Sequence, residues 1–324
     1  MTYCVGLKLG KGLVFMSDTR TNAGVDNISV FKKMFQWEVE GERSITLMTA
    51  GNLATTQSVV SLLNERALPV EERGTPSILE APSMFQIARL VGETLKEVIA
   101  DQEGREGPVA DSPFGATIIL GGQVRGGEPR LFLIYPEGNF VEAAEDTPFF
   151  QIGETKYGKP ILVRAYDPGM RFEEAVKLLM LSFDSTLKAN LSVGLPLDMH
   201  LYEADTFRHG LRRRIETDDA FFAEISSGWG EKLRDAFATL PDYDLTYAGV
   251  VISNRACAAL RAAPGGAFSC ENARGCLWRV VWSAGALARV ARAGASPLRR
   301  RSRLPGNGHR FFGQDERGAL LSVG

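Results

Sequence analysis

Short apolar runs separated by glycine dominate the first 50 residues. Residues 2–9 and 13–20 are apolar-rich runs around the glycines at 10 and 12, a pattern that predicts a β-hairpin. The run at 44–50 predicts another short buried strand. Helical spacing of apolar residues over 53–68 predicts that a helix follows it.

Further along the chain, strands and helices come in groups. Amphipathic helices are predicted at 83–102 and 171–190, a shorter one from near Glu154, and one at 218–240 interrupted at Gly228–Gly230. Strand-like runs cover 115–124, 130–136, 140–144, 148–153, 196–204, 209–216 and 245–253. Grouped strands and grouped helices favour an α+β fold in which helix pairs cover packed sheets.

Composition fits a soluble globular protein, with 44% hydrophobic and 23% charged residues among 324. No run is long enough to span a membrane, and the N-terminus lacks the pattern of a secretory signal, so we expect a cytoplasmic protein. Four cysteines without metal-ligand spacing predict neither a disulfide framework nor a metal site. The glycine-rich stretch 121–127 reads as a hairpin turn, so no nucleotide or other cofactor is expected.

The last 70 residues differ in composition from the rest of the chain. From residue 255 onward there are twelve arginines, no lysine and three carboxylates. This segment has three interpretations: a basic nucleic-acid-binding tail, a disordered extension, or the out-of-frame translation of a GC-rich gene. We favour the last, do not expect nucleic acid as a partner, and divide the chain into a domain at 1–253 and an extension at 254–324.

Common catalytic machinery is missing from the sequence. There are three histidines and no G-x-S-x-G motif, which argues against a Ser-His-Asp hydrolase. An N-terminal threonine would supply both nucleophile and base. If Met1 is removed, Thr2 carries an α-amine with a pKa of about 7.7–8.0, which can accept the proton of its own hydroxyl. The direct start into a strand would hold that terminus in place.

Three further positions make Thr2 a candidate site. With Leu9 opposite Leu13 in the hairpin, Thr2, Cys4, Asp18 and Arg20 would share one face of the sheet. Asp18 would then lie near Thr2, although a carboxylate at a strand end is also an ordinary turn residue.

Two adjacent lysines, Lys32 and Lys33, lie in a strand-like run at 30–35. One of them must point inward if that strand is half-buried, and a buried lysine needs a partner such as Asp18. The alternative is two solvated lysines.

The third position of the candidate site lies in a strand-to-helix junction at 49–52. Gly51 allows close approach of backbone, and Asn52 is a plausible helix N-cap. A backbone N–H at a helix N-terminus suits a developing oxyanion, while an ordinary strand-to-helix turn has the same local geometry.

These residues together resemble the proteasome-like N-terminal-nucleophile hydrolases called Anbu, the "ancestral β subunit". The resemblance rests on "TYCVGLKL", "GLVFMSDTRTNAGVDNIS", "FKKMF", "MTAGNLATTQSVVSLLNER" and "EAPSMFQIARLVGETLKEVIAD", and it extends to about residue 253. It implies a four-layer αββα sandwich and self-assembly into a ring or spiral. It also implies a threonine peptidase acting on peptides or proteins without a cofactor; the alternatives are a catalytically weak scaffold or a non-proteolytic amidohydrolase.

The resemblance assigns roles to individual positions. Thr2 matches the nucleophile, Asp18 the carboxylate, Lys33 the lysine that polarises the hydroxyl, and Gly51 the oxyanion-hole glycine. The residues implied around the substrate side chain are Thr21, Phe31, Phe35, Thr49 and Leu53. Asp184 and Ser192 lie where the family has a supporting Asp and Ser, but without the usual D-x-x-S-G spacing.

Overall fold

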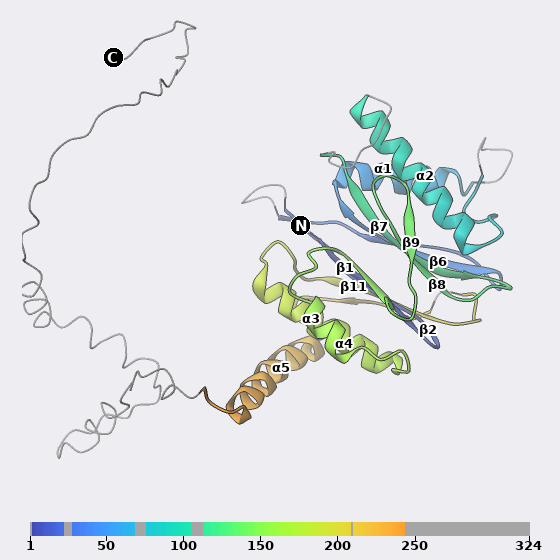
Figure 1. Ribbon diagram of the computed structural model, residues 1–324. Helices are drawn as coiled ribbons and strands as arrows, with labels where there is room; N and C mark the ends of the chain where they lie inside the picture. The colour runs from blue at the N-terminus through green and yellow to red at the C-terminus, as the bar shows by residue number, and fades with distance from the viewer. Residues whose placement is uncertain (1, 23–27, 69–75, 105–112, 209, 244–324) are drawn as a thin grey trace, which may run out of the picture. The chain divides into compact units, whose positions relative to one another are not determined.

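Two five-stranded antiparallel sheets pack face to face, and a helix pair covers the outer face of each (Figure 1). The computed structural model describes residues 2–22, 28–68, 76–104, 113–208 and 210–243. The helices and strands of these described residues lie within one compact unit, Met1–Pro241, and a second unit begins at Asp242.

The first sheet has the strand order β10-β1-β2-β11-β12 and carries the start of the chain. Its strands are β10 (Phe149–Gly153), β1 (Tyr3–Leu9), β2 (Gly12–Asp18), β11 (Leu197–Glu203) and β12 (Arg212–Ile215). The second sheet contains β5 (Met34–Val39), β6 (Arg43–Gly51), β7 (Ala116–Val124), β8 (Arg130–Ile134) and β9 (Phe140–Glu142) in that order. A separate short pair joins β3 (Arg20–Asn22) to β4 (Ile28–Val30).

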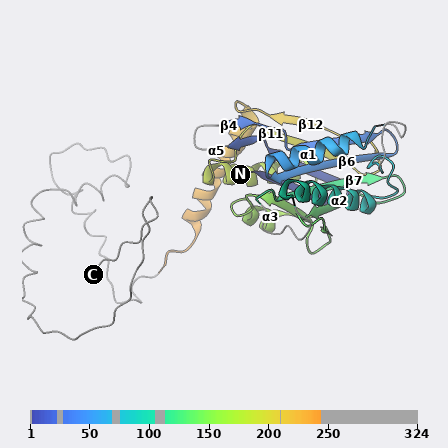
Figure 2. The same ribbon diagram turned by 90° about the horizontal axis from the view of Figure 1, so that it is seen from above.

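Helices α1 (Leu53–Glu65) and α2 (Met84–Glu103) cover the second sheet, and the view from above shows them beside β6 and β7 (Figure 2). Helices α3 (Lys159–Ala165) and α4 (Phe172–Ala189) cover the first sheet. Helix α5 (Ala220–Thr239) packs on α4 near its own start, where Phe222 is buried. The predicted α+β class and αββα layering are thus confirmed.

Strand β1 shows why the sequence begins with an almost unbroken apolar run. Tyr3, Val5 and Leu7 point into the core beneath α3 and α4, while Cys4 points into the core between the two sheets. Both faces of the strand are therefore buried, so neither set of alternating positions needs to be polar. The first residues of the chain are held by two cores at once.

The predicted hairpin exists, but its predicted register was wrong by one residue. Leu9 lies opposite Gly12, which places Cys4 opposite Ser17 rather than opposite Asp18. Gly12 belongs to strand β2 because β11 passes very close to it: a Cβ at this position would lie 2.0 Å from the Tyr202 carbonyl oxygen. The turn is therefore two residues long, and strand alternation does not bring Thr2 and Asp18 together.

The helices also differ from expectation in two places. The short helix begins at Lys159 rather than near Glu154, so Glu154 lies in the loop after β10. Helix α5 continues through Gly228–Gly230, because a glycine inside a helix weakens it by about 1 kcal/mol without removing a backbone hydrogen bond. The strand predicted at 245–253 and the extension at 254–324 lie outside the described residues, so the domain boundary stays a prediction.

Candidate active site

The main chain at Thr2 is fixed from two sides. Its carbonyl oxygen accepts a hydrogen bond of 2.7 Å from the Glu154 N–H, in the loop after β10. The N–H of the next residue, Tyr3, donates to Oδ1 of Asp18 at 2.9 Å. Thr2 itself is half-buried at the entry to β1. The residue predicted to be the nucleophile thus has a fixed backbone and is partly exposed.

Asp18 and Lys33 form a buried ion pair next to this strand. Lys33 Nζ lies 2.8 Å from Asp18 Oδ1, and the two side chains are 5% and 0% exposed. The ammonium also donates to the Arg20 carbonyl oxygen at 2.5 Å. Burial raises the pKa of Asp18, and the charge of Lys33 and the Tyr3 N–H oppose that rise.

The two adjacent lysines have opposite environments, which is one of the two alternatives that the sequence left open. Lys33 is buried against Asp18, whereas Lys32 is exposed and its Nζ lies 5.4 Å from the centre of the Phe35 ring. The residues between β4 and β5 follow no regular strand pairing, which allows neighbouring side chains to point in different directions. The carboxylate and lysine of the hypothesis therefore meet in space.

Gly51 ends strand β6 in a backbone conformation that suits glycine alone, with φ at +118°. A Cβ there would lie 2.5 Å from the Gly115 carbonyl oxygen and 2.7 Å from Ala116 Cα. Asn52 follows as the N-cap of α1, and its side chain accepts from the Thr55 N–H at 3.2 Å. The predicted junction of strand, glycine and helix N-terminus is present.

The residues implied around the substrate side chain lie on several elements. Thr49 is close to the ion pair, since its N–H donates to the Lys33 carbonyl oxygen at 3.0 Å. Phe35 packs against the core beneath α1 and α2, and Leu53 is the first residue of α1. Thr21 lies on β3, and the Phe31 N–H donates to the Thr19 carbonyl oxygen at 2.8 Å. Their contact with substrate stays a prediction.

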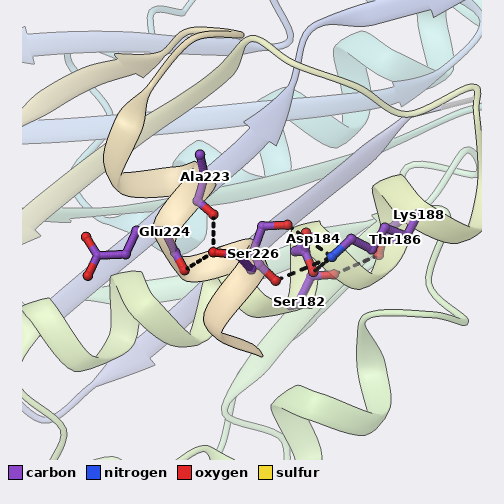
Figure 3. Close-up of polar contacts among 8 residues, drawn as sticks. Ser182, Asp184, Thr186, Lys188, Ala223, Glu224 and Ser226 are labelled. Atoms are coloured by element: carbon purple, nitrogen blue, oxygen red, sulfur yellow. Dashed lines mark hydrogen bonds and ion pairs between the residues drawn. The ribbon is translucent and has the colours of Figure 1, made fainter. Parts of the chain in front are cut away.

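Asp184 makes its hydrogen bonds within the helical layer rather than at Thr2. Lys188, one turn further along α4, donates to Asp184 Oδ2 and to Ser226 Oγ of α5, both at 3.0 Å (Figure 3). The close-up shows Lys188 reaching between the two helices. This contact fastens α5 to α4. Ser192 lies in the loop after α4, where its N–H donates to Asn190 Oδ1 at 2.9 Å.

Two polar residues that sequence reasoning missed lie closer to Thr2. Glu154, whose N–H holds the Thr2 carbonyl, is 5% exposed, and its Oε2 accepts from Asn190 Nδ2 at 3.0 Å. Its Oε1 accepts from the Lys156 N–H at 3.1 Å. Glu154 and Asn190 are far apart in the sequence, and a helix start was expected at Glu154, so no local pattern distinguished them.

Tyr3 ties the same strand to α4 through its side chain. Its hydroxyl is hydrogen-bonded to Ser182 Oγ at 2.7 Å and accepts from Gln151 Nε2 at 2.6 Å. Burial raises the pKa of Tyr3 to about 12, so this hydroxyl stays protonated. Along the described part of the chain, no group of three or more metal-ligating side chains comes together. None of its helices is long and apolar enough to cross a membrane.

Comparison with known proteins identifies the family of this chain. A family model described as "Proteasome subunit" matches residues 102–195, from the end of α2 to the loop after α4. Anbu (ancestral beta-subunit) from Yersinia bercovieri is 48% identical, with a TM-score of 0.70, and the match covers 75% of this chain and 100% of that one. The chain belongs to the Anbu family.

Two other Anbu structures have similar values. Anbu from Hyphomicrobium sp. strain MC1 is 49% identical with a TM-score of 0.68, and 75% of this chain and 100% of that chain are covered. A structure described as the helical assembly of the Anbu complex from Pseudomonas aeruginosa is 44% identical with a TM-score of 0.70, covering 76% and 100%. No curated protein matches this chain. The resemblance inferred from the sequence is thus confirmed.

Proposed function

We propose that this Anbu-family chain is an amide hydrolase, a threonine-type peptidase whose nucleophile is Thr2 after removal of Met1. The observation that carries the proposal is the buried Lys33–Asp18 pair, bonded through the Tyr3 N–H to the residue directly after Thr2. A buried ion pair is a poor source of stability compared with apolar packing, so its presence beside the first strand of the chain favours a chemical role.

The proposed reaction needs only groups of the chain, the substrate and water. Thr2 Oγ1 forms a bond to the carbonyl carbon of a peptide, and the hydroxyl proton passes to the Thr2 α-amine. When the C–N bond breaks, that proton goes to the leaving nitrogen, and an ester on Thr2 remains. Water then attacks the ester, and the acid product leaves with Thr2 regenerated. The Lys33 ammonium favours the developing alkoxide by its charge, and Asp18 keeps the ammonium in place.

The negative charge on the substrate oxygen needs a donor during each attack. We infer that the backbone N–H at Gly51 supplies it, assisted by the N-terminus of α1. Gly51 is required here because the Gly115–Ala116 backbone approaches it closely and leaves no room for a side chain. A peptide or protein is the expected substrate.

Self-assembly is a second part of the proposal. The Pseudomonas relative, described as a helical assembly, is 44% identical and fully covered. Helix α5 adds an observation of this chain, since Leu233, Phe237 and Leu240 are 49%, 80% and 66% exposed. Apolar side chains exposed on one helix are typical of protein contacts. The proposal also requires a cytoplasmic protein, because initiator methionine is removed there.

Hydrolysis of fluorogenic peptides by Thr2 variants tests the proposal. Thr2→Ala and Thr2→Ser both keep a small second residue, so Met1 removal and the α-amine are retained in each. We expect Thr2→Ala to lose at least about 1,000-fold in kcat/KM and Thr2→Ser to keep measurable activity. Equal turnover by Thr2→Ala and the unsubstituted protein would exclude Thr2 as nucleophile. Assembled but inactive protein across the peptide panel would favour a scaffold instead.

A further inference from the structure

The backbone at Thr2 is hydrogen-bonded to two residues with buried carboxylates, of which the proposed reaction uses one. Asp18 is bonded on the side of Tyr3, and Glu154 is bonded to the Thr2 carbonyl on the other side through its own N–H. We propose that Glu154, held by Asn190, is a positioning residue for Thr2 that places a buried carboxylate beside the α-amino group. This inference rests on the proposed function.

Glu154 is restrained at three atoms. Its N–H donates to the Thr2 carbonyl oxygen at 2.7 Å, Oε1 accepts from the Lys156 N–H at 3.1 Å, and Oε2 accepts from Asn190 Nδ2 at 3.0 Å. A carboxylate that is 5% exposed has lost most of its water, and two charge-assisted hydrogen bonds compensate for that loss. Its charge is therefore fixed within about one side-chain length of Thr2.

Asn190 gives this carboxylate a defined orientation. It follows α4 as the C-cap residue, and its N–H donates to the Thr186 carbonyl oxygen at 2.8 Å. Its side-chain amide donates to Glu154 and accepts from the Ser192 N–H at 2.9 Å. The end of α4 is thus connected through Asn190 and Glu154 to the Thr2 backbone.

Other charged groups face this corner from the neighbouring elements. Asp18, at the end of β2, and Lys33, just before β5, form an ion pair at 2.8 Å. Arg20 packs against Gly194 and donates to the Leu191 carbonyl oxygen at 3.1 Å. On α4, Lys188 and Asp184 form a pair at 3.0 Å.

The consequence concerns the base of the reaction. A carboxylate near an amine favours the protonated amine and raises its pKa, by about one unit at an effective dielectric constant between those of protein and water. The Lys33 ammonium acts in the opposite direction. Glu154 would offset the effect of Lys33 and keep the pKa of the Thr2 amine close to neutral pH. The amine can then both accept and return the proton.

The test is the pH dependence of N-terminal amine labelling in the untagged full chain. Acetic anhydride in trace amounts reacts with the neutral amine only. The labelling rate of the Thr2 peptide, measured against pH, therefore gives the titration midpoint of the Thr2 α-amine. We expect Glu154→Gln to lower the midpoint by about one unit. Glu137→Gln, which removes an exposed carboxylate from the β8–β9 turn, should leave it unchanged.

An exchange variant keeps the test decisive if a single substitution weakens the fold. In the double variant E154Q/N190D the amide and the carboxylate change places, which retains the hydrogen bond and returns one negative charge. Its midpoint should move back toward that of the unsubstituted protein. The proposal is wrong if Glu154→Gln leaves the midpoint unchanged, or if the exchange fails to move it back in a folded protein.

Activity distinguishes this inference from the proposed function. If the chain hydrolyses no peptide but its amine midpoint responds to Glu154, the proposed function fails and the electrostatic role stands. If the peptide is hydrolysed with kcat, KM and the acidic limb of the pH profile unchanged in Glu154→Gln, the role of Glu154 fails and the nucleophile stands. Lower kcat with unchanged KM and a shifted acidic limb supports both.

Discussion

Removing one partner of the Lys33–Asp18 pair should destabilise the protein more than removing both. Asp18→Asn keeps an acceptor for the Tyr3 N–H but leaves the Lys33 ammonium, 5% exposed, without its counter-charge. Lys33→Met keeps the volume of the side chain but leaves Asp18 buried and unpaired. The double variant D18N/K33M has neither charge.

The magnitude follows from the burial of both groups. An uncompensated charge in such a site costs about 3–5 kcal/mol, whereas replacement of both partners by neutral groups of similar shape costs far less. For a domain of this size, about 4 kcal/mol corresponds to roughly 10 °C in Tm. The Arg20 carbonyl, which also accepts from Lys33, keeps part of the ammonium solvated in Asp18→Asn. We therefore expect the lower end of the range for that variant.

Lys33→Met has an additional signature in pH. Burial already raises the pKa of Asp18, and loss of the ammonium removes the main opposing charge. The folded state then binds a proton more readily than the unfolded state, whose aspartate titrates near 3.9. The free energy of unfolding of this variant should increase, relative to that of the unsubstituted protein, as the pH falls toward the pKa of the unfolded aspartate.

Urea unfolding at one fixed protein concentration measures these differences. The exposed pair Arg89–Glu93, at 3.6 Å on α2, is the matched control, and its single variants should change stability by less than about 1 kcal/mol. Two small and additive effects at Lys33 and Asp18 would refute the reasoning, because they would mean that neither charge is desolvated by the fold.

Three further predictions concern residues around the site. Gly51→Ala should reduce stability by more than about 2 kcal/mol and abolish hydrolysis, because the new Cβ would meet backbone atoms. Gly126→Ala, also at positive φ but in open space, should keep activity. Equal effects of the two variants in urea unfolding and peptide assays would contradict this prediction. His200 is buried with its pKa lowered to about 4, so the folded state resists protonation and about 3 kcal/mol of stability should be lost as the pH falls from about 6.5 to 4. His200→Gln should show a shallower slope in that window, and an identical slope would argue against a buried neutral imidazole. Tyr3→Phe leaves Ser182 Oγ without one of its partners and should lower stability by about 1–3 kcal/mol in thermal unfolding, whereas an unchanged Tm would contradict the bond.

Much of the fold follows from local pattern. The spacing of apolar residues predicted α2 and α4 within one or two residues, and grouping predicted the layers. The resemblance chose Lys33 over Lys32, because the position of two adjacent lysines in a half-buried segment leaves open which one points inward. The helices and the layers depend on residues that are close in sequence, so one sequence is enough to predict them.

The predictions that were wrong or missing depend on contacts between residues far apart in the sequence. The register of the first hairpin depends on Gly12, and that glycine is required by the approach of β11, nearly 190 residues away in sequence. Strand alternation therefore does not explain why Asp18 lies near Thr2. The reason is the hydrogen bond from the Tyr3 N–H to Asp18. Glu154 and Asn190 meet because β10 and the end of α4 are neighbours in the fold, and neither residue has a motif.

The measurement that tests the central claim most directly is mass spectrometry of the untagged protein after reaction with a peptide epoxyketone. That electrophile joins to both the hydroxyl and the α-amine of an N-terminal threonine. We expect a chain that begins at Thr2 and carries one adduct on its N-terminal peptide, with no adduct in Thr2→Ala. A chain that keeps Met1, or an adduct that is absent or lies on another residue, would contradict it.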